Sequence, residues 1–274
     1  MRIDPLSRRF LSKAGLIPAE KGRGPVVLMY HSISNGGSRP INQWSVSAEN
    51  FRKQLALLNH EGWKTICVRD LLNPDILSPR TVVITFDDGY INNFDHGFLE
   101  LVKYGFRATW FIVSRDVGKK SGWKDHDSDA MEMLKKSQLR EMVSAGMEIG
   151  AHTRTHTRLP ELNMSRLQDE VAGSKKELEG LLGIPVTSFT YPYGLFNEQC
   201  VEAVRKAGYK VACTTRTGWF GSEPDLLKVR RVAVFSYDSL SSFARKLAFA
   251  DTNVSWGKMT KYMAKRLFQR INRS

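Results

Sequence analysis

The sequence lacks three features that would place it quickly in a class of protein. No apolar run approaches the roughly 18 residues that a membrane-spanning helix needs. The basic first ten residues are not followed by the apolar core and small-residue cleavage site of a secretory signal. The three cysteines are odd in number and widely spaced, which excludes a zinc ribbon or a paired redox dithiol. We therefore expect buried, unreactive cysteines in a cytoplasmic protein, with peripheral contact to a membrane as the alternative.

The composition is that of a globular protein with a sizeable core. Hydrophobic residues make up 42% of the 274 residues and charged residues 25%, which excludes an intrinsically disordered chain. The chain has 41 Lys and Arg against 28 Asp and Glu, for a net charge of +13, and the excess is concentrated in 2–23 and 258–273. Such charge favours phosphate-bearing partners. We expect no nucleic-acid partner, because no helix-turn-helix, zinc-finger or aromatic–basic motif is present.

Strand-like and helix-like segments alternate along most of the chain. This alternation predicts a mostly parallel sheet, and seven or so units predict a closed or nearly closed α/β barrel. An α/β barrel of about 200 to 250 residues would use nearly the whole chain. Strands are predicted at 26–30, 63–68, 81–86, 108–113, 148–151, 187–191, 211–214 and 229–235, and helices at 48–60, 92–103, 166–182 and 198–207, with one more beginning behind Ser137 as its N-cap.

The predicted organisation is a basic N-terminal extension at 1–25, one catalytic domain at 26–250, and a basic amphipathic helix at 251–274. In the last segment Met259, Met263, Leu267 and Ile271 fall on one helical stripe, and Lys and Arg occupy the rest. Such a helix could lie on an anionic membrane. It could equally pack on the barrel with a solvated basic face.

Three polar clusters each follow an apolar strand-like run. They are Asp87-Asp88, His152-Thr-Arg-Thr-His156 and Tyr191-Pro-Tyr-Gly194. In a parallel barrel the carboxyl ends of the strands form the catalytic face, so we expect these clusters to meet. A polar stretch between Arg115 and Lys136 predicts a surface loop, with Trp123 as a candidate substrate contact.

Two imidazoles and a carboxylate can bind a divalent metal and leave positions open for water and substrate. The spacing of His152 and His156 is weak support alone, because a solvated helix face or two core histidines would look the same. Asp87 and Asp88 could also form only a turn before Gly89. A cation would relieve the repulsion between the adjacent carboxylates. One could then bind the metal while the other accepts a proton from the attacking water.

Taken in order, Thr85-Phe-Asp-Asp-Gly89, His152-Thr-Arg-Thr-His156 and Tyr191-Pro-Tyr-Gly194 resemble the motifs of the polysaccharide deacetylases of carbohydrate esterase family 4, the NodB-homology group. The resemblance covers residues 26–235. It implies a distorted (β/α)7-type barrel and a metal-binding hydrolase of carbohydrate metabolism. Zinc is the metal it implies first, with nickel and cobalt as alternatives.

The resemblance also implies roles for single residues. Asp87 would be the general base, and Asp88 would bind the metal together with His152 and His156. Tyr193 would contribute chiefly its backbone N–H to the oxyanion, and Pro192, before it, would fix the local backbone.

The chain departs from the family pattern in two places. The usual Arg two residues before the Pro-Tyr pair is replaced by Thr190, so Arg231 becomes the candidate that orients the base, with a surface arginine as the alternative. No histidine follows His156, so the late Leu-x-His element is absent. The segment Met29-Tyr-His-Ser-Ile33 resembles members that take the catalytic acid from the N-terminal strand, which makes His31 the candidate. A buried, hydrogen-bonded histidine is the alternative.

The expected function is removal of N-acetyl groups from an amino sugar in a polysaccharide or glycolipid, with release of acetate. An O-acetyl esterase or a deformylase acting on a lipid-linked sugar could use the same metal and base. A glycan-binding protein without activity is the alternative of another class. The sugar, its attachment and the oligomeric state do not follow from the sequence.

Overall fold

The computed structural model describes residues 24–35, 42–78, 80–123 and 131–255, together with residues 257 and 260. The predicted N-terminal extension and C-terminal helix lie almost wholly outside these residues, so both stay predictions. Among the helices of the described part, none is long and apolar enough to cross a membrane.

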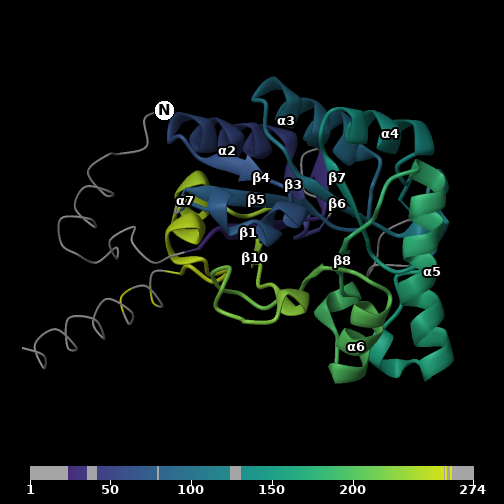
Figure 1. The fold of residues 1–274 in the computed structure, drawn as a ribbon. Helices are drawn as coiled ribbons and strands as arrows, with labels where there is room; N and C mark the ends of the chain where they lie inside the picture. The colour runs from purple at the N-terminus through teal and green to yellow at the C-terminus, as the bar shows by residue number, and fades with distance from the viewer. Residues whose placement is uncertain are drawn as a thin grey trace, which may run out of the picture.

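A curled sheet of eight parallel strands forms the centre of the molecule (Figure 1). Seven strands follow the order β10-β1-β5-β6-β7-β8-β9, and β4 pairs with β5 beside this path. The fold is thus the α/β barrel that the alternation of segments predicts, and it agrees with the distorted (β/α) barrel that the resemblance to the NodB-homology group implies. The bounds are β1 Val26–Tyr30, β4 Lys64–Ile66, β5 Thr81–Phe86, β6 Thr109–Ile112, β7 Glu148–Ala151, β8 Ser188–Thr190, β9 Val211–Cys213 and β10 Val232–Ala233.

The chain closes the barrel between its two end strands. Val229 pairs with Cys213 at the end of β9, whereas Val232 and Ala233 pair with β1. The backbone N–H of Arg231 donates to the carbonyl of Arg216 at 2.9 Å, between these two pairings. The segment from 229 to 233 therefore bridges the seam, and Arg231 lies in it.

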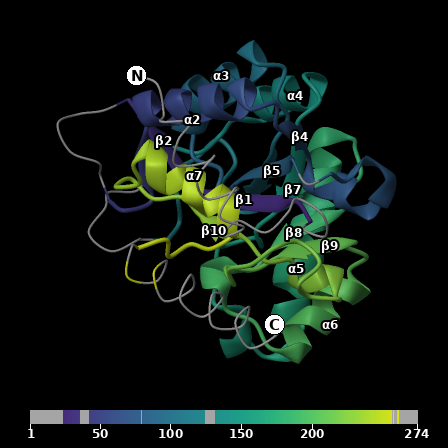
Figure 2. The ribbon, with the colours of Figure 1, turned by 90° about the vertical axis from the view of Figure 1, so that its left-hand side faces the viewer.

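Helices cover the outside of the sheet. Figures 1 and 2 show α2, α3 and α4 along one side and α5 and α6 along the other, with α7 next to α2. A separate pair of short strands, β2 (Ser32–Ser34) and β3 (Ser45–Ser47), follows β1. The helices are α2 Ala48–His60, α3 Leu99–Lys103, α4 Lys136–Ser144, α5 Met164–Leu182, α6 Glu198–Lys206 and α7 Leu240–Phe249, and a π-helix at Phe94–Phe98 precedes α3.

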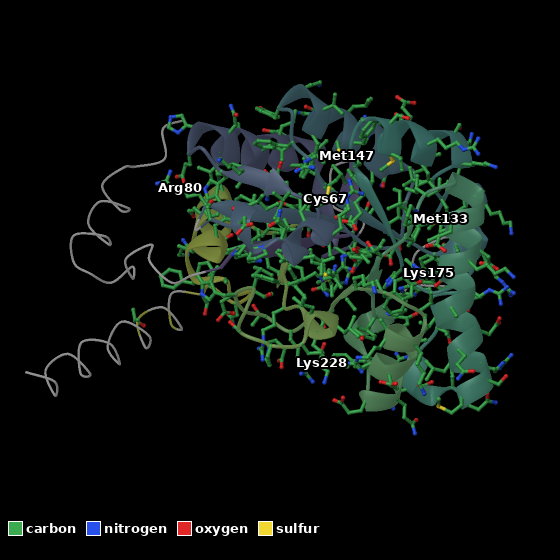
Figure 3. The ribbon with its side chains drawn as sticks, viewed as in Figure 1. Cys67, Arg80, Met133, Met147, Lys175 and Lys228 are labelled. Carbon is green, nitrogen blue, oxygen red and sulfur yellow. The ribbon has the colours of Figure 1, made fainter. Side chains whose placement is uncertain are left out.

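The central strands are buried on both faces, as parallel strands under helices usually are. Every residue of β1 and β5 is buried, and the rings of Phe86 and Trp110 stack with centroids 4.7 Å apart. All three cysteines are free and buried, as expected. The thiol of Cys67, labelled in Figure 3, lies 3.6 Å from the carbonyl of Ala108.

Several predicted boundaries differ from the observed ones, and two of the differences have a clear physical reason. Helix α4 begins at Lys136, not behind Ser137, because the side chain of Gln138 accepts a hydrogen bond from the backbone N–H of Lys135 and caps the helix there. The strand predicted at 229–235 is reduced to β10, because its first residue pairs with β9 and not with β1.

Candidate active site

Three loops at the carboxyl ends of β5, β7 and β8 bring the predicted polar clusters to one place. Their backbone is unusual, since four non-glycine residues there have positive φ: Asp88 at 72°, Thr153 at 64°, His156 at 55° and Tyr193 at 58°. Outside this site, one further described non-glycine residue, Ala250, has a positive φ. Such conformations are costly and concentrate at functional sites.

Asp88, His152 and His156 converge on a common point. One carboxylate oxygen of Asp88 lies 3.4 Å from Nε2 of His152 and 3.3 Å from Nε2 of His156. All three residues are buried, and their ligand atoms lie within 4.8 Å of one another. Burial opposes ionisation of Asp88, but the hydrogen bonds from His152 and His156 outweigh it and hold its pKa well below the ordinary value.

The arrangement fits a divalent cation. Zinc bonds of about 2.0 to 2.1 Å in a tetrahedral geometry place neighbouring ligand atoms about 3.3 to 3.4 Å apart, which matches both carboxylate–imidazole distances. Nδ1 of His152 lies 2.9 Å from the carbonyl oxygen of Thr190, so that carbonyl accepts a hydrogen bond from Nδ1–H and leaves Nε2 for the metal. The three residues could therefore hold a cation.

The carboxylate of Asp87 has a different hydrogen-bond partner from the carboxylate of Asp88. Its two carboxylate oxygens accept hydrogen bonds of 2.7 Å each from the two terminal nitrogens of Arg231. Burial alone would raise the pKa of Asp87, but the charge and hydrogen bonds of Arg231 lower it. The side chain is therefore an ionised carboxylate beside the candidate metal site.

Arg231 is held by the ends of three strands. Its guanidinium, which is 1% exposed, also donates to Thr85 in β5, Thr190 in β8 and the carbonyl of Thr214 after β9, at 2.8 to 3.0 Å. A surface arginine is thereby excluded. The guanidinium is placed between these strand ends because the backbone of Arg231 is fixed in the segment that joins β9 to β1.

His31 follows β1 and lies in the wall of the same pocket. The side-chain amide of Asn93 holds the backbone here, because it donates to the carbonyl of His31 at 2.6 Å and accepts from the N–H of Ile33 at 2.8 Å. The imidazole also packs on Trp44, with centroids 4.5 Å apart. Burial lowers the pKa of His31 and outweighs the opposite effect of Asp88 and Asp87.

Tyr193 and Trp123 flank the ring of His156. The edge of the Tyr193 ring faces His156 at 4.6 Å, and its hydroxyl lies 3.1 Å from Nδ1. Trp123 stacks on the other side at 4.4 Å. It is 8% exposed and is not among the described residues that line the pocket, and its role as a substrate contact stays a prediction. Pro192 is buried at the first position of a short 3-10 helix, where its fixed φ is compatible with the turn.

The loop between the two histidines is anchored to α5. Glu170 accepts hydrogen bonds from the backbone N–H groups of Arg154 and Thr155, at 2.9 and 3.0 Å, and from the Thr155 hydroxyl at 2.8 Å. Two guanidinium nitrogens of Arg154 donate to Glu177. A Cβ at Gly173 would lie 2.6 Å from Arg154, so the absence of a side chain there allows the loop to sit on the helix.

A pocket of about 520 Å³ opens over the site. Its wall includes His31, Asp87 and Asp88, both candidate ligand histidines, Trp44, Arg158 and Tyr193. No sequence pattern indicates Trp44, Asn93, Arg158 or Glu170, because each acts through contacts with other segments of the chain.

Known proteins are similar to this chain over most of its length. The model of the polysaccharide deacetylase family matches residues 75–212. The Bacillus subtilis protein YxkH, named as a polysaccharide deacetylase, is 33% identical over 231 residues, which are 83% of this chain and 77% of that protein.

Two further relatives carry more specific names. The poly-beta-1,6-N-acetyl-D-glucosamine N-deacetylase of Staphylococcus aureus is 29% identical over 185 residues, which cover 63% of this chain and 62% of that protein. The crystallised deacetylase PplD of Streptococcus pyogenes, in complex with acetate, has a TM-score of 0.70 at 25% identity and covers 82% of this chain and 98% of its own. With the family model and YxkH, these similarities show that the chain belongs to the polysaccharide deacetylase family.

Proposed function

We propose that this protein is a metal-dependent N-deacetylase that hydrolyses N-acetyl groups on an amino sugar of a polysaccharide and releases acetate. One observation supports it above all others. The carboxylate of Asp87 is paired with a buried arginine. The next residue carries a second carboxylate, which converges with two imidazole nitrogens on a place where a metal ion could bind. The Staphylococcus aureus relative is named as a polysaccharide N-deacetylase, and the Streptococcus pyogenes relative is named as a deacetylase and holds acetate, and both names support this proposal.

Asp88, His152 and His156 would hold the cation, and zinc suits this set of one carboxylate and two imidazoles, with nickel and cobalt as alternatives. When bound, a zinc ion supplies a Lewis acid that polarises the acetyl carbonyl and lowers the pKa of water.

Asp87 is assigned as the general base. The bidentate bond from Arg231 fixes the plane of its carboxylate and keeps it ionised, so it can accept the proton of a water that attacks the acetyl carbon. The new carbon–oxygen bond gives a tetrahedral intermediate. The backbone N–H of Tyr193, aimed by the positive φ of that residue and by Pro192, is assigned to the developing oxyanion.

His31 is assigned as the acid that protonates the departing nitrogen when the carbon–nitrogen bond breaks. The lowered pKa of its half-buried imidazole makes the protonated form a stronger acid. Asn93 holds the backbone of His31 through its carbonyl, and Trp44 packs on its imidazole. The products are acetate and a free amino group on the sugar.

The test combines metal analysis with product analysis. Purified wild-type protein should bind one equivalent of divalent metal and release acetate from N-acetylated oligosaccharides, and Asp87→Asn should keep the metal but lose most turnover. Release of acetate from O-acetylated sugars alone, or of formate from lipid-linked glycans, would identify a different hydrolase. Binding of glycan without any turnover would leave a glycan-binding protein.

A further inference from the structure

The two candidate histidine ligands are supported in different ways. Nδ1 of His152 is hydrogen-bonded to the carbonyl of Thr190, a backbone group in the buried strand β8. Nδ1 of His156 instead lies 3.1 Å from the hydroxyl of a side chain, Tyr193. The backbone thus fixes the first ligand, whereas the orientation of the second depends on a tyrosine.

His156 lies between two aromatic rings. Trp123 stacks on one side of the imidazole with an interplanar angle of 27°, and Tyr193 meets it edge-on at 62°. The guanidinium of Arg158 lies over the Tyr193 ring, 4.9 Å from its centre, and stabilises that ring where it is 43% exposed at the pocket wall. The two aromatic rings leave the imidazole of His156 little freedom to rotate.

We propose that Tyr193 is a positioning residue for the metal centre through its side chain, separately from any role of its backbone. The hydroxyl accepts a hydrogen bond from Nδ1–H of His156 and so favours the tautomer that leaves the Nε2 lone pair for the cation that His156 would share with Asp88. Trp123 holds the plane of the same ring. The inference rests on the metal site of the proposed function, and it assigns Trp123 a place in support of a ligand.

Zinc affinity tests the hydroxyl directly. Tyr193→Phe keeps the ring and removes the hydroxyl, and it should weaken zinc binding about ten-fold to a hundred-fold in competition with a chromophoric chelator, the range for loss of a partner behind a metal ligand. Tyr237→Phe is the matched control, because Tyr237 is 69% exposed and outside the site. It should bind zinc as wild type does. Equal affinities for Tyr193→Phe and wild type would overturn the proposal.

NMR of imidazole protons gives a readout that a general loss of stability would not produce. In zinc-loaded protein labelled with ¹⁵N-histidine, both His152 and His156 should show a protonated Nδ1. Tyr193→Phe should shift the resonance of the Nδ1 proton of His156 and accelerate its exchange with water. The Nδ1 proton of His152 should not change and is the internal reference. A wild-type spectrum in which His156 binds through Nδ1 would refute the inference without any variant. Wild-type protein that binds no zinc would instead refute the metal site itself, and the inference with it.

Discussion

Arg231 and Asp87 lie 144 residues apart in the chain and meet through two parallel hydrogen bonds of 2.7 Å inside the barrel. The arginine comes from the segment that closes the sheet, and the aspartate from the loop after a central strand. The closure of the barrel and the orientation of the candidate base therefore depend on the same residue.

Replacing Arg231 by methionine should lower both stability and activity. Asp87 would keep its buried charge without a partner, and removal of one partner from a buried pair costs about 3 to 5 kcal/mol. Urea unfolding should show this loss. The double variant Arg231→Met with Asp87→Asn should recover part of it, since the unpaired charge is gone. Arg205→Met, in an exposed pair with Glu202, is the control and should leave the midpoint unchanged. A single variant as stable as wild type would contradict a structural pair.

His31→Ala should bind one equivalent of metal and lose most turnover, because the imidazole is assigned to protonate the leaving nitrogen. Metal analysis and acetate release measure the two properties on one sample. Asn93→Ala should reduce kcat with metal content unchanged, since both hydrogen bonds that span His31 are lost. Full activity of His31→Ala would remove this residue from the mechanism.

Glu170→Ala should weaken metal binding although Glu170 touches no candidate ligand. Its carboxylate holds the backbone of Arg154 and Thr155, and without it the loop between His152 and His156 loses three hydrogen bonds to α5. Zinc competition should show a loss of about ten-fold. Glu202→Ala, an exposed glutamate on α6, is the comparison. If both variants bind zinc equally, the anchor does not shape the site.

Glu148 should make the protein less stable as the pH rises. This carboxylate is buried in β7, and burial raises its pKa above the ordinary 4.5 in spite of hydrogen bonds from Ser188, Thr109 and the backbone of Arg69. The folded state thus favours the protonated form. Its stabilising contribution is complete below pH 4.5 and is lost as the pH rises through the folded pKa.

Glu148→Gln removes that titration. Its free energy of unfolding relative to wild type should increase between pH 4 and pH 7, by about 1.4 kcal/mol for each unit of pKa shift. Denaturant unfolding at both pH values measures the difference, in which the other titrating groups cancel. A difference that does not change with pH would show that Glu148 keeps its ordinary pKa in the folded protein.

Local patterns predicted the parts of the structure that depend on neighbours in the chain. The buried runs before Asp87 and His152 became strands, and parallel topology brought their ends together as expected. Local patterns could not predict the contacts between side chains from distant strands and loops of the barrel. Asn93 touches Ile33, 60 residues earlier, and nothing in the spacing around either residue indicates that pairing. The stacking of Trp123 on His156 could not be predicted either, because the loop that carries Trp123 has no regular period, and its role as a substrate contact stays a prediction.

The left-handed backbone at Asp88, Thr153, His156 and Tyr193 limits how this centre could be transplanted. If only these side chains were copied onto the loops of another barrel, they would point in other directions, because non-glycine residues in ordinary loops rarely have positive φ. Whole loops would have to be transferred, together with the helix surface that holds them. Thr153→Gly would tolerate the positive φ, but it would remove the hydroxyl that accepts a hydrogen bond from the backbone N–H of His156 at 3.0 Å.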